Sequence, residues 1–137
     1  MPAHDWRWLK AQCIQESWLD PEAVSHAGAV GLCQFMPGTW ADAMRTLGLT
    51  GKRTDSALSI RAAGWYMARL ERNWAGRGRT PPERLPLAMS SFNCGLGCVL
   101  SAQRRAQDAR DWPAIAPYLP REAAEYPVRI AKHYRCL

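Results

Sequence analysis

The chain has 137 residues, 47% of them hydrophobic and 22% charged, which suits one compact globular domain. Its net charge of +6 favours polyanionic partners, but the basic residues are scattered and no dense basic run marks a nucleic-acid-binding tail. No segment approaches the roughly 18 apolar residues of a membrane span, and the first residues lack the apolar region of a signal peptide. We therefore expect no stable membrane insertion, and the sequence leaves the export route open.

The apolar spacing predicts helices along the whole chain, and apolar alternation with a period of two persists nowhere. The first predicted helix runs from about Asp5, a suitable N-cap, to Trp18, and the Asp20-Pro21 pair stops it. The other predicted helices cover Thr39–Leu47, Ser56–Trp74, Leu85–Phe92, Cys98–Ala109, a short segment that starts at Asp111 with Pro113, and Arg121–Tyr134. These elements predict an all-α, or mostly α, fold in a single domain over residues 1–137.

Turn-forming residues set the boundaries of these predicted helices. Thr39 is the expected N-cap of the second helix, and Gly48 closes it. The sequence Thr-Pro-Pro-Glu at residues 80–83 is expected to break the chain. Pro127 predicts a kink or a boundary in the last helix.

The first predicted helix places an acid at the end of an apolar stripe. Trp6, Leu9, Cys13 and Glu16 follow the spacing of one helix face, whereas a solvated glutamate would share the charged side of the helix. An apolar setting raises the pKa of a carboxyl group because desolvation disfavours its charged form. The pattern therefore predicts a carboxyl group that can hold a proton near neutral pH.

Four blocks of the sequence form an ordered set: Glu16-Ser17, Gly-Leu-Cys-Gln at residues 31–34, Ser-Phe-Asn-Cys-Gly at residues 91–95 and Glu-Ala-Ala-Glu-Tyr-Pro-Val at residues 122–128. Together they resemble the soluble lytic transglycosylase (SLT) family of lysozyme-like domains. Glu16-Ser17 begins the first block, and Gly-Leu-Cys-Gln at residues 31–34 is similar to the Gly-Leu-Met-Gln block, with cysteine in the methionine place. Ser-Phe-Asn-Cys-Gly at residues 91–95 is similar to the Ala-Tyr-Asn-Ala-Gly block. Glu-Ala-Ala-Glu-Tyr-Pro-Val at residues 122–128 is similar to the Glu-Thr-x-x-Tyr-Val block.

The resemblance implies a lysozyme-like domain with a substrate groove and one catalytic acid, Glu16. Glu16 would protonate the bond between N-acetylmuramic acid and N-acetylglucosamine in peptidoglycan. It would then accept the proton of the muramic 6-hydroxyl, which closes onto C1 and gives a 1,6-anhydro sugar without consuming water. One acid would thus serve twice, whereas most glycosidases use two carboxylates.

The resemblance also implies a set of substrate-binding residues: Ser17, Gln34, Phe92, Asn93 and Tyr126. Ser17 would orient the carboxyl or the sugar acetamide, or simply end its helix, and Asn93 would bind sugar or hold its turn. Phe92 replaces a tyrosine of the family, so only a ring face remains. Tyr126 would reach the catalytic carboxyl with its hydroxyl, or serve as core.

Alternative functions stay open at this point. A hydrolytic muramidase of the same fold would release a reducing end, and an inactive wall-binding module would only bind. A basic helical DNA-binding domain is favoured only by charge and helix content. The main hypothesis predicts glycan strands as the partner, no nucleic acid, no cofactor or metal, and a monomer. The expected place of action is the periplasm or the cell wall, and the small size suits a phage-encoded enzyme.

The five cysteines are an odd number, so at least one is unpaired or bonds to another chain. Cys94 and Cys98 flank a glycine-containing turn and are one predicted disulfide. Cys13 with Cys136 is the second, which leaves Cys33 unpaired. The alternative is a set of buried, reduced thiols. No histidine lies near Cys94 and Cys98 at zinc-site spacing, which argues against a metal site.

Overall fold

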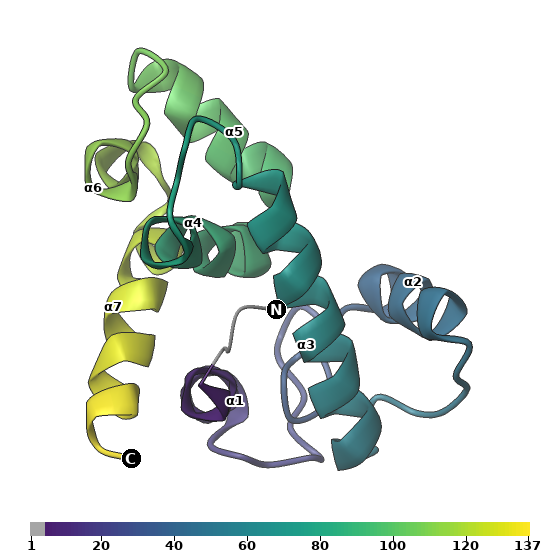
Figure 1. Cartoon of the computed structure of the whole chain (residues 1–137). Helices are drawn as coiled ribbons and strands as arrows, with labels where there is room; N and C mark the ends of the chain where they lie inside the picture. The colour runs from purple at the N-terminus through teal and green to yellow at the C-terminus, as the bar shows by residue number, and fades with distance from the viewer. Residues whose placement is uncertain (1–4) are drawn as a thin grey trace. The chain divides into compact units, whose positions relative to one another are not determined.

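The computed structural model describes residues 5–137, which are mostly helical (Figure 1). The elements are α1 (Trp6–Ser17), α2 (Pro37–Leu47), α3 (Ser56–Asn73), α4 (Pro81–Cys94), α5 (Leu96–Arg105), α6 (Trp112–Ile115), the 3₁₀ helix η1 (Ala116–Tyr118) and α7 (Arg121–Arg135). Extended pairing within residues 5–137 is limited to two isolated bridges, Val24–Val30 and Val30–Phe35. This confirms the all-α prediction.

The described residues form two compact units. One, called here the N-terminal unit, comprises residues 5–66 and 130–137, and the other, the central unit, comprises residues 67–129. Both α3 and α7 contribute residues to each unit. The assignment of residues 1–137 to one catalytic domain stays a prediction.

Helix α1 opens the N-terminal unit much as the sequence predicts. The Asp5 side chain accepts a hydrogen bond from the backbone N–H of Arg7, and the helix ends at Ser17. The predicted apolar stripe is wrong at its first member, because Trp6 lies in the first turn with 67% of its surface exposed. The buried residues of α1 are Ala11, Gln12 and Cys13.

Two predicted helix starts lie too far along the chain, and both errors involve proline. Helix α2 begins at Pro37, with Met36 and not Thr39 as its N-cap, although Gly48 closes it in the left-handed conformation as predicted. Helix α4 begins at Pro81, so residues 80–83 start a helix where a break was expected. Proline suits the first turn because the N–H that it lacks has no partner inside the helix.

The acid of the same sequence secures the start of α4. Glu83 accepts a hydrogen bond from the backbone N–H of Thr80 at 2.7 Å, which satisfies a donor that the helix leaves open. Arg110 contacts the same carboxylate at 2.9 Å.

After the C-terminal end of α4, α5 begins at Leu96, directly after Gly95, and ends at Arg105. The predicted span of 98–109 is therefore shifted by a few residues.

Helix α7 runs through Pro127, so this residue marks no boundary.

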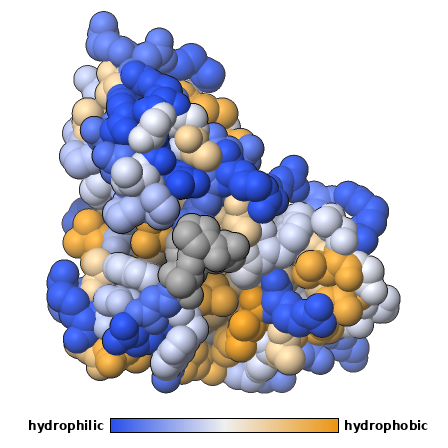
Figure 2. All heavy atoms as spheres, viewed as in Figure 1, coloured by the Kyte–Doolittle hydropathy of each residue, from blue (hydrophilic) through white to orange (hydrophobic). Residues whose placement is uncertain are grey.

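Figure 2 shows hydrophilic side chains spread over the face in view, with smaller hydrophobic areas between them. Within residues 5–137 no single helix is long and apolar enough to cross a membrane. The α4–α5 pair meets that criterion together, by length and composition only, and is bent by 118° at Gly95.

Candidate active site

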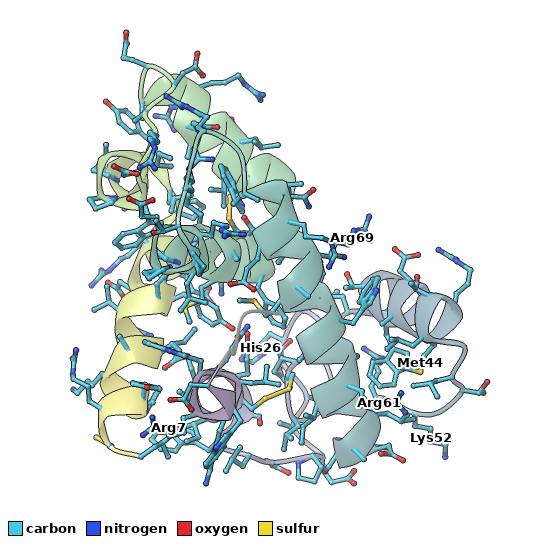
Figure 3. The ribbon with its side chains drawn as sticks, in the orientation of Figure 1. Arg7, His26, Met44, Lys52, Arg61 and Arg69 are labelled. Atoms are coloured by element: carbon cyan, nitrogen blue, oxygen red, sulfur yellow. A yellow bond between two sulfur atoms is a disulfide. The ribbon has the colours of Figure 1, made fainter. Side chains whose placement is uncertain are left out.

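The predicted site residues fall into two groups, one in each unit. Glu16, Ser17 and Gln34 belong to the N-terminal unit, and Phe92, Asn93 and Tyr126 belong to the central unit. Figure 3 draws the side chains of both units as sticks on the ribbon. Each group is described within its own unit.

Glu16 is half-buried in the last turn of α1. The chain leaves the helix two residues later, since Trp18 and Leu19 both adopt left-handed backbone conformations with φ of 55° and 62°. Two successive left-handed residues with large side chains are uncommon and cost free energy. The turn that follows Glu16 is therefore held by contacts elsewhere in the unit.

Ser17 supplies the first of these contacts. Its hydroxyl donates to the carbonyl of Leu32 at 2.7 Å and accepts from the backbone N–H of Asp20 at 3.1 Å. The hydroxyl thus ties the end of α1 both to the following turn and to the loop that carries Gln34. Its predicted contact with the carboxyl or with substrate stays a prediction.

The loop from Ala23 to Phe35 has no helix of its own and is held by scattered backbone hydrogen bonds, such as those between Val30 and Phe35, and by side chains. Arg53 donates from Nη1 to the carbonyls of Gly28 (3.0 Å) and Phe35 (2.8 Å). The approach is close at Gly31, where φ is +93° and an added Cβ would meet the Arg53 carbonyl oxygen at 2.1 Å. Glycine is required there, which explains the first residue of the Gly-Leu-Cys-Gln block. Sequence reasoning missed Arg53, and no local pattern distinguishes it from the other arginines.

Gln34 lies in the turn between the paired residues Val30 and Phe35, with φ of 56°. Its Nε2 donates to the carbonyls of Ala23 (3.1 Å) and Gly31 (2.9 Å). Both bonds use the amide nitrogen, so the side chain is oriented and its amide oxygen is the group that can accept a hydrogen bond from a sugar. Gln34 is half-buried, and its role in binding stays a prediction.

The disulfide of the N-terminal unit joins Cys13 to Cys33, with a Cα–Cα distance of 4.9 Å. The predicted Cys13–Cys136 bond is therefore wrong, and so is the assignment of Cys33 as the unpaired cysteine. Cys136 is free and exposed near the end of the chain. The loop folds back on α1 and brings the fully buried Cys33 against Cys13, one helical turn before Glu16. This disulfide thus connects the helix of Glu16 to the residue before Gln34.

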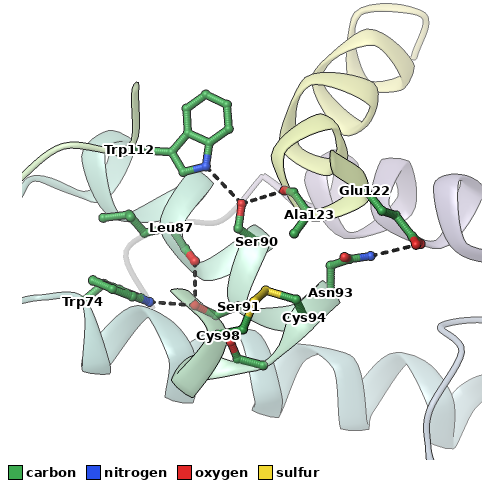
Figure 4. The surroundings of a disulfide bond; sticks show 11 residues. Trp74, Leu87, Ser90, Ser91, Asn93, Cys94, Cys98, Trp112, Glu122 and Ala123 are labelled. Atoms are coloured by element: carbon green, nitrogen blue, oxygen red, sulfur yellow. Dashed lines mark hydrogen bonds between the residues drawn. A yellow bond between two sulfur atoms is a disulfide. The ribbon is translucent and has the colours of Figure 1, made fainter. Parts of the chain in front are cut away.

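In the central unit, the last turn of α4 faces the first turns of α7 (Figure 4). The rings of Phe92 and Tyr126 stack with an interplanar angle of 9° and centroids 6.5 Å apart. The Asn93 side chain donates to Glu122 Oε1 at 3.5 Å. Phe92 and Asn93 are half-buried, whereas Tyr126 is only 3% exposed.

The predicted Cys94–Cys98 disulfide is confirmed, with a Cα–Cα distance of 5.8 Å. It closes the corner between α4 and α5, directly after Asn93 (Figure 4). Gly95 at this corner has φ of +96°, a conformation that favours glycine. Across residues 5–137, no group of three or more histidine, cysteine or acidic side chains is arranged to hold a metal ion.

The chain belongs to the transglycosylase SLT domain family, whose model matches residues 1–115. The membrane-bound lytic murein transglycosylase F of Alcanivorax borkumensis is 33% identical over 120 residues, which are 85% of this chain and 24% of that protein. The protein of the same name from Maricaulis maris is 35% identical over 120 residues, 85% of this chain and 25% of that protein. The chain therefore spans about a quarter of the length of these relatives.

Two solved structures show the same fold. The soluble lytic transglycosylase SLT70 of Escherichia coli aligns with a TM-score of 0.76 and 21% identity, over 98% of this chain and 22% of that one. The lytic transglycosylase Slt of Pseudomonas aeruginosa, in an inactive glutamate-to-glutamine mutant, aligns with a TM-score of 0.75 and 23% identity, over 93% and 20% of the two chains. Together with the helical content, this confirms the predicted lysozyme-like fold class.

Proposed function

We propose that the chain is a peptidoglycan lytic transglycosylase that cleaves the bond between N-acetylmuramic acid and N-acetylglucosamine and forms a 1,6-anhydro product. Membership of the SLT domain family carries this proposal. The resemblance of the Glu16-Ser17 block to the family's first block supports Glu16 as the acid. The relatives are named lytic murein transglycosylases, and murein is peptidoglycan. The inactive mutant of the Pseudomonas enzyme replaces a glutamate by glutamine, which suits a mechanism that depends on one acid.

Glu16 is the proposed catalytic residue. A carboxyl group next to the glycosidic oxygen donates its proton as the bond breaks, and the resulting carboxylate then accepts the proton of the muramic 6-hydroxyl. The half-buried position of Glu16 limits the water around the carboxyl group. Partial exclusion of water favours ring closure over hydrolysis of the oxocarbenium-like intermediate.

The proposed glycan contacts use the geometry of each unit. The oriented amide of Gln34 offers its oxygen to a sugar N–H or hydroxyl, and the Asn93 amide offers both donor and acceptor atoms. The ring of Phe92 offers an apolar face to a pyranose. Ser17 and Tyr126 complete the proposed set, the former beside the acid and the latter from a buried position, where its ring stacks on Phe92.

The two disulfides support a place of action outside the cytoplasm. Disulfides persist in oxidising spaces such as the bacterial periplasm, so action in the periplasm or the cell wall suits both bonds. We further propose that the domain acts as a monomer without inserting into a membrane or binding nucleic acid. An origin in a phage would agree with this chemistry.

The deciding experiment is digestion of purified peptidoglycan followed by mass spectrometry of the released muropeptides. The proposal predicts products that end in 1,6-anhydro-N-acetylmuramic acid, lighter by one water than the products of a muramidase. Release of reducing-end products only would replace the transglycosylase by a hydrolase of the same fold. Wall binding without any release would identify a binding module.

A further inference from the structure

Pro127 leaves a gap in the hydrogen bonding of α7. A proline has no backbone N–H, so the carbonyl four residues earlier, that of Ala123, cannot accept the usual helix hydrogen bond from residue 127. Ala123 is fully buried and Pro127 is buried too. A buried carbonyl without a hydrogen bond would destabilise this turn of α7, so another group has to supply the donor.

The hydroxyl of Ser90 supplies it. Ser90 lies on α4 with none of its surface exposed, and its Oγ donates to the Ala123 carbonyl at 2.9 Å. The same oxygen accepts from the indole N–H of Trp112 at 3.0 Å. Figure 4 shows both bonds, with Ser90 between α7 and the indole of Trp112. The donor that Pro127 removes from α7 is thus replaced from α4.

This bond lies between the candidate site residues of the central unit. Ser90 precedes Phe92 and Asn93 by less than one helical turn, and Ala123 lies between Glu122 and Tyr126 on α7. A shift of α7 along α4 at this point would change the ring stacking at 6.5 Å and the amide–carboxylate contact at 3.5 Å together.

We propose that Ser90 is a positioning residue of the site, because its bond to the Ala123 carbonyl replaces the hydrogen bond that α7 loses at Pro127. This bond holds α7 in place on α4. It thereby sets the position of Tyr126 relative to Phe92 and of Glu122 relative to Asn93. This inference rests on the proposed function for its kinetic consequence, but its structural content holds for the domain whatever it cleaves. Ser90 itself touches no reacting group and acts through the residues that it aligns.

The neighbouring Ser91 provides a matched control. It is also fully buried on α4, and its hydroxyl also accepts from an indole N–H, that of Trp74, at 2.9 Å. Its own proton goes to the carbonyl of Leu87 at 2.8 Å, within the same helix. Replacing either serine by alanine removes a buried hydroxyl and an indole partner, but only Ser90→Ala removes the bond to α7.

The first test compares the kinetics of the two variants on soluble glycan strands, well below their melting temperatures. Ser90→Ala should lower kcat/KM about tenfold, mainly through KM, while Ser91→Ala stays within about threefold, because misplacement of contact residues by less than 1 Å has effects of this size. Equal losses in the two variants, or no loss in either, would overturn the proposal.

The second test restores the missing donor in α7. Pro127→Ala returns an N–H that can bond to the Ala123 carbonyl, so Ser90→Ala with Pro127→Ala should recover most of the lost kcat/KM. The same substitution should not rescue Ser91→Ala. Should Ser90→Ala alone not fold, a double variant that folds with near-normal KM supports the proposal. A double variant that fails to fold, or folds with a tenfold higher KM, rejects it.

A structural readout separates this inference from the enzymatic proposal. Nuclear Overhauser cross-peaks between the ring protons of Phe92 and Tyr126 should be present in the wild type and in Ser91→Ala, and weakened in Ser90→Ala. If the wild type released no muropeptides, the proposed function would fail while this comparison still decided the role of Ser90. Unchanged cross-peaks in Ser90→Ala would reject the positioning role even in an active enzyme.

Discussion

Both units carry a disulfide beside candidate site residues, but the two bonds act on different kinds of backbone. In the N-terminal unit, Cys13–Cys33 spans 20 residues and joins a helix to an irregular loop. In the central unit, Cys94–Cys98 spans 4 residues and closes a corner between two helices. The difference follows from where the site residues lie, since Gln34 sits on a loop and Phe92 and Asn93 end a helix.

A helix has a continuous series of backbone hydrogen bonds, whereas the loop that carries Gln34 has only scattered ones, such as those between Val30 and Phe35. This loop is held in addition by Arg53, Ser17 and the Cys13–Cys33 bond. The corner after Asn93 already has regular helices on both sides and needs only a short link. Cross-links that close longer loops remove more entropy from the unfolded chain, so the two disulfides should differ in their contribution to stability.

The largest expected effect comes from Glu16→Gln, which changes the chemistry of the N-terminal group and leaves both disulfides in place. The amide keeps the shape of the side chain but cannot donate a proton as the acid does, so activity on peptidoglycan should fall by about 10² to 10⁴. Melting temperature and muropeptide release are measured on the same preparations. Glu22→Gln, an exposed site in the following turn, is the control and should retain wild-type activity. Residual activity above about a tenth of wild type would remove Glu16 from the role of catalytic acid.

The next effect is on stability. Cys13→Ala with Cys33→Ala should lower the free energy of unfolding by about 3 kcal/mol in the chain-entropy model, because the bond closes a loop of 20 residues. Activity should fall as well, since the loop that orients Gln34 is released from α1. Urea unfolding of the oxidised proteins measures the stability change. A loss well under 1 kcal/mol would mean that hydrogen bonds alone hold this loop.

The matched double variant in the central unit should lose less. Cys94→Ala with Cys98→Ala opens a loop of only 4 residues, for which the same model gives about 2 kcal/mol. Titration of thiols in the denatured, unreduced wild type should find one free thiol, that of Cys136. A larger loss of stability in this variant than in the N-terminal double variant would contradict the expected difference between the two disulfides. Three free thiols would show that one of the two disulfides is absent, and five would show that both are absent.

The sequence predicted features that depend on near neighbours. The Cys94–Cys98 bond, the Gly48 helix end and the Asp5 N-cap each involve residues a few positions apart, so local spacing was enough. The Cys13–Cys33 bond depends on the loop folding back onto α1. Sequence spacing alone does not favour Cys33 over Cys136 as the partner of Cys13. Long-range pairing of this kind is decided by packing, which the sequence pattern does not contain.

The candidate site also divides into features that the sequence predicts and features that only the structure shows. The resemblance of the four blocks predicts Glu16, Gln34 and Asn93 as site residues, which stays a prediction. The residues that hold them are visible only in the structure. Arg53 looked like any other arginine, and Ser90 is one of two adjacent serines whose bonds lead to different helices. Pro127 predicts a kink or boundary because a proline removes a helix bond, and in the structure Ser90 on α4 supplies a replacement donor.

The smallest expected effect concerns the start of α4. The Arg110 side chain and then the backbone N–H of Thr80 lower the pKa of Glu83 from 4.5 to about 2. Because the pKa is lower in the folded state than in the unfolded chain, the contribution of Glu83 to stability is present above about pH 4.5 and is lost as the pH falls toward 2. Glu83→Gln keeps an oxygen that can accept from Thr80 but no longer titrates. The urea midpoint of the wild type should therefore fall more between about pH 6 and about pH 3 than that of the variant. Equal falls would show that the carboxylate is no better paired in the folded protein than in water, and that the start of α4 rests on its prolines and the neutral hydrogen bond.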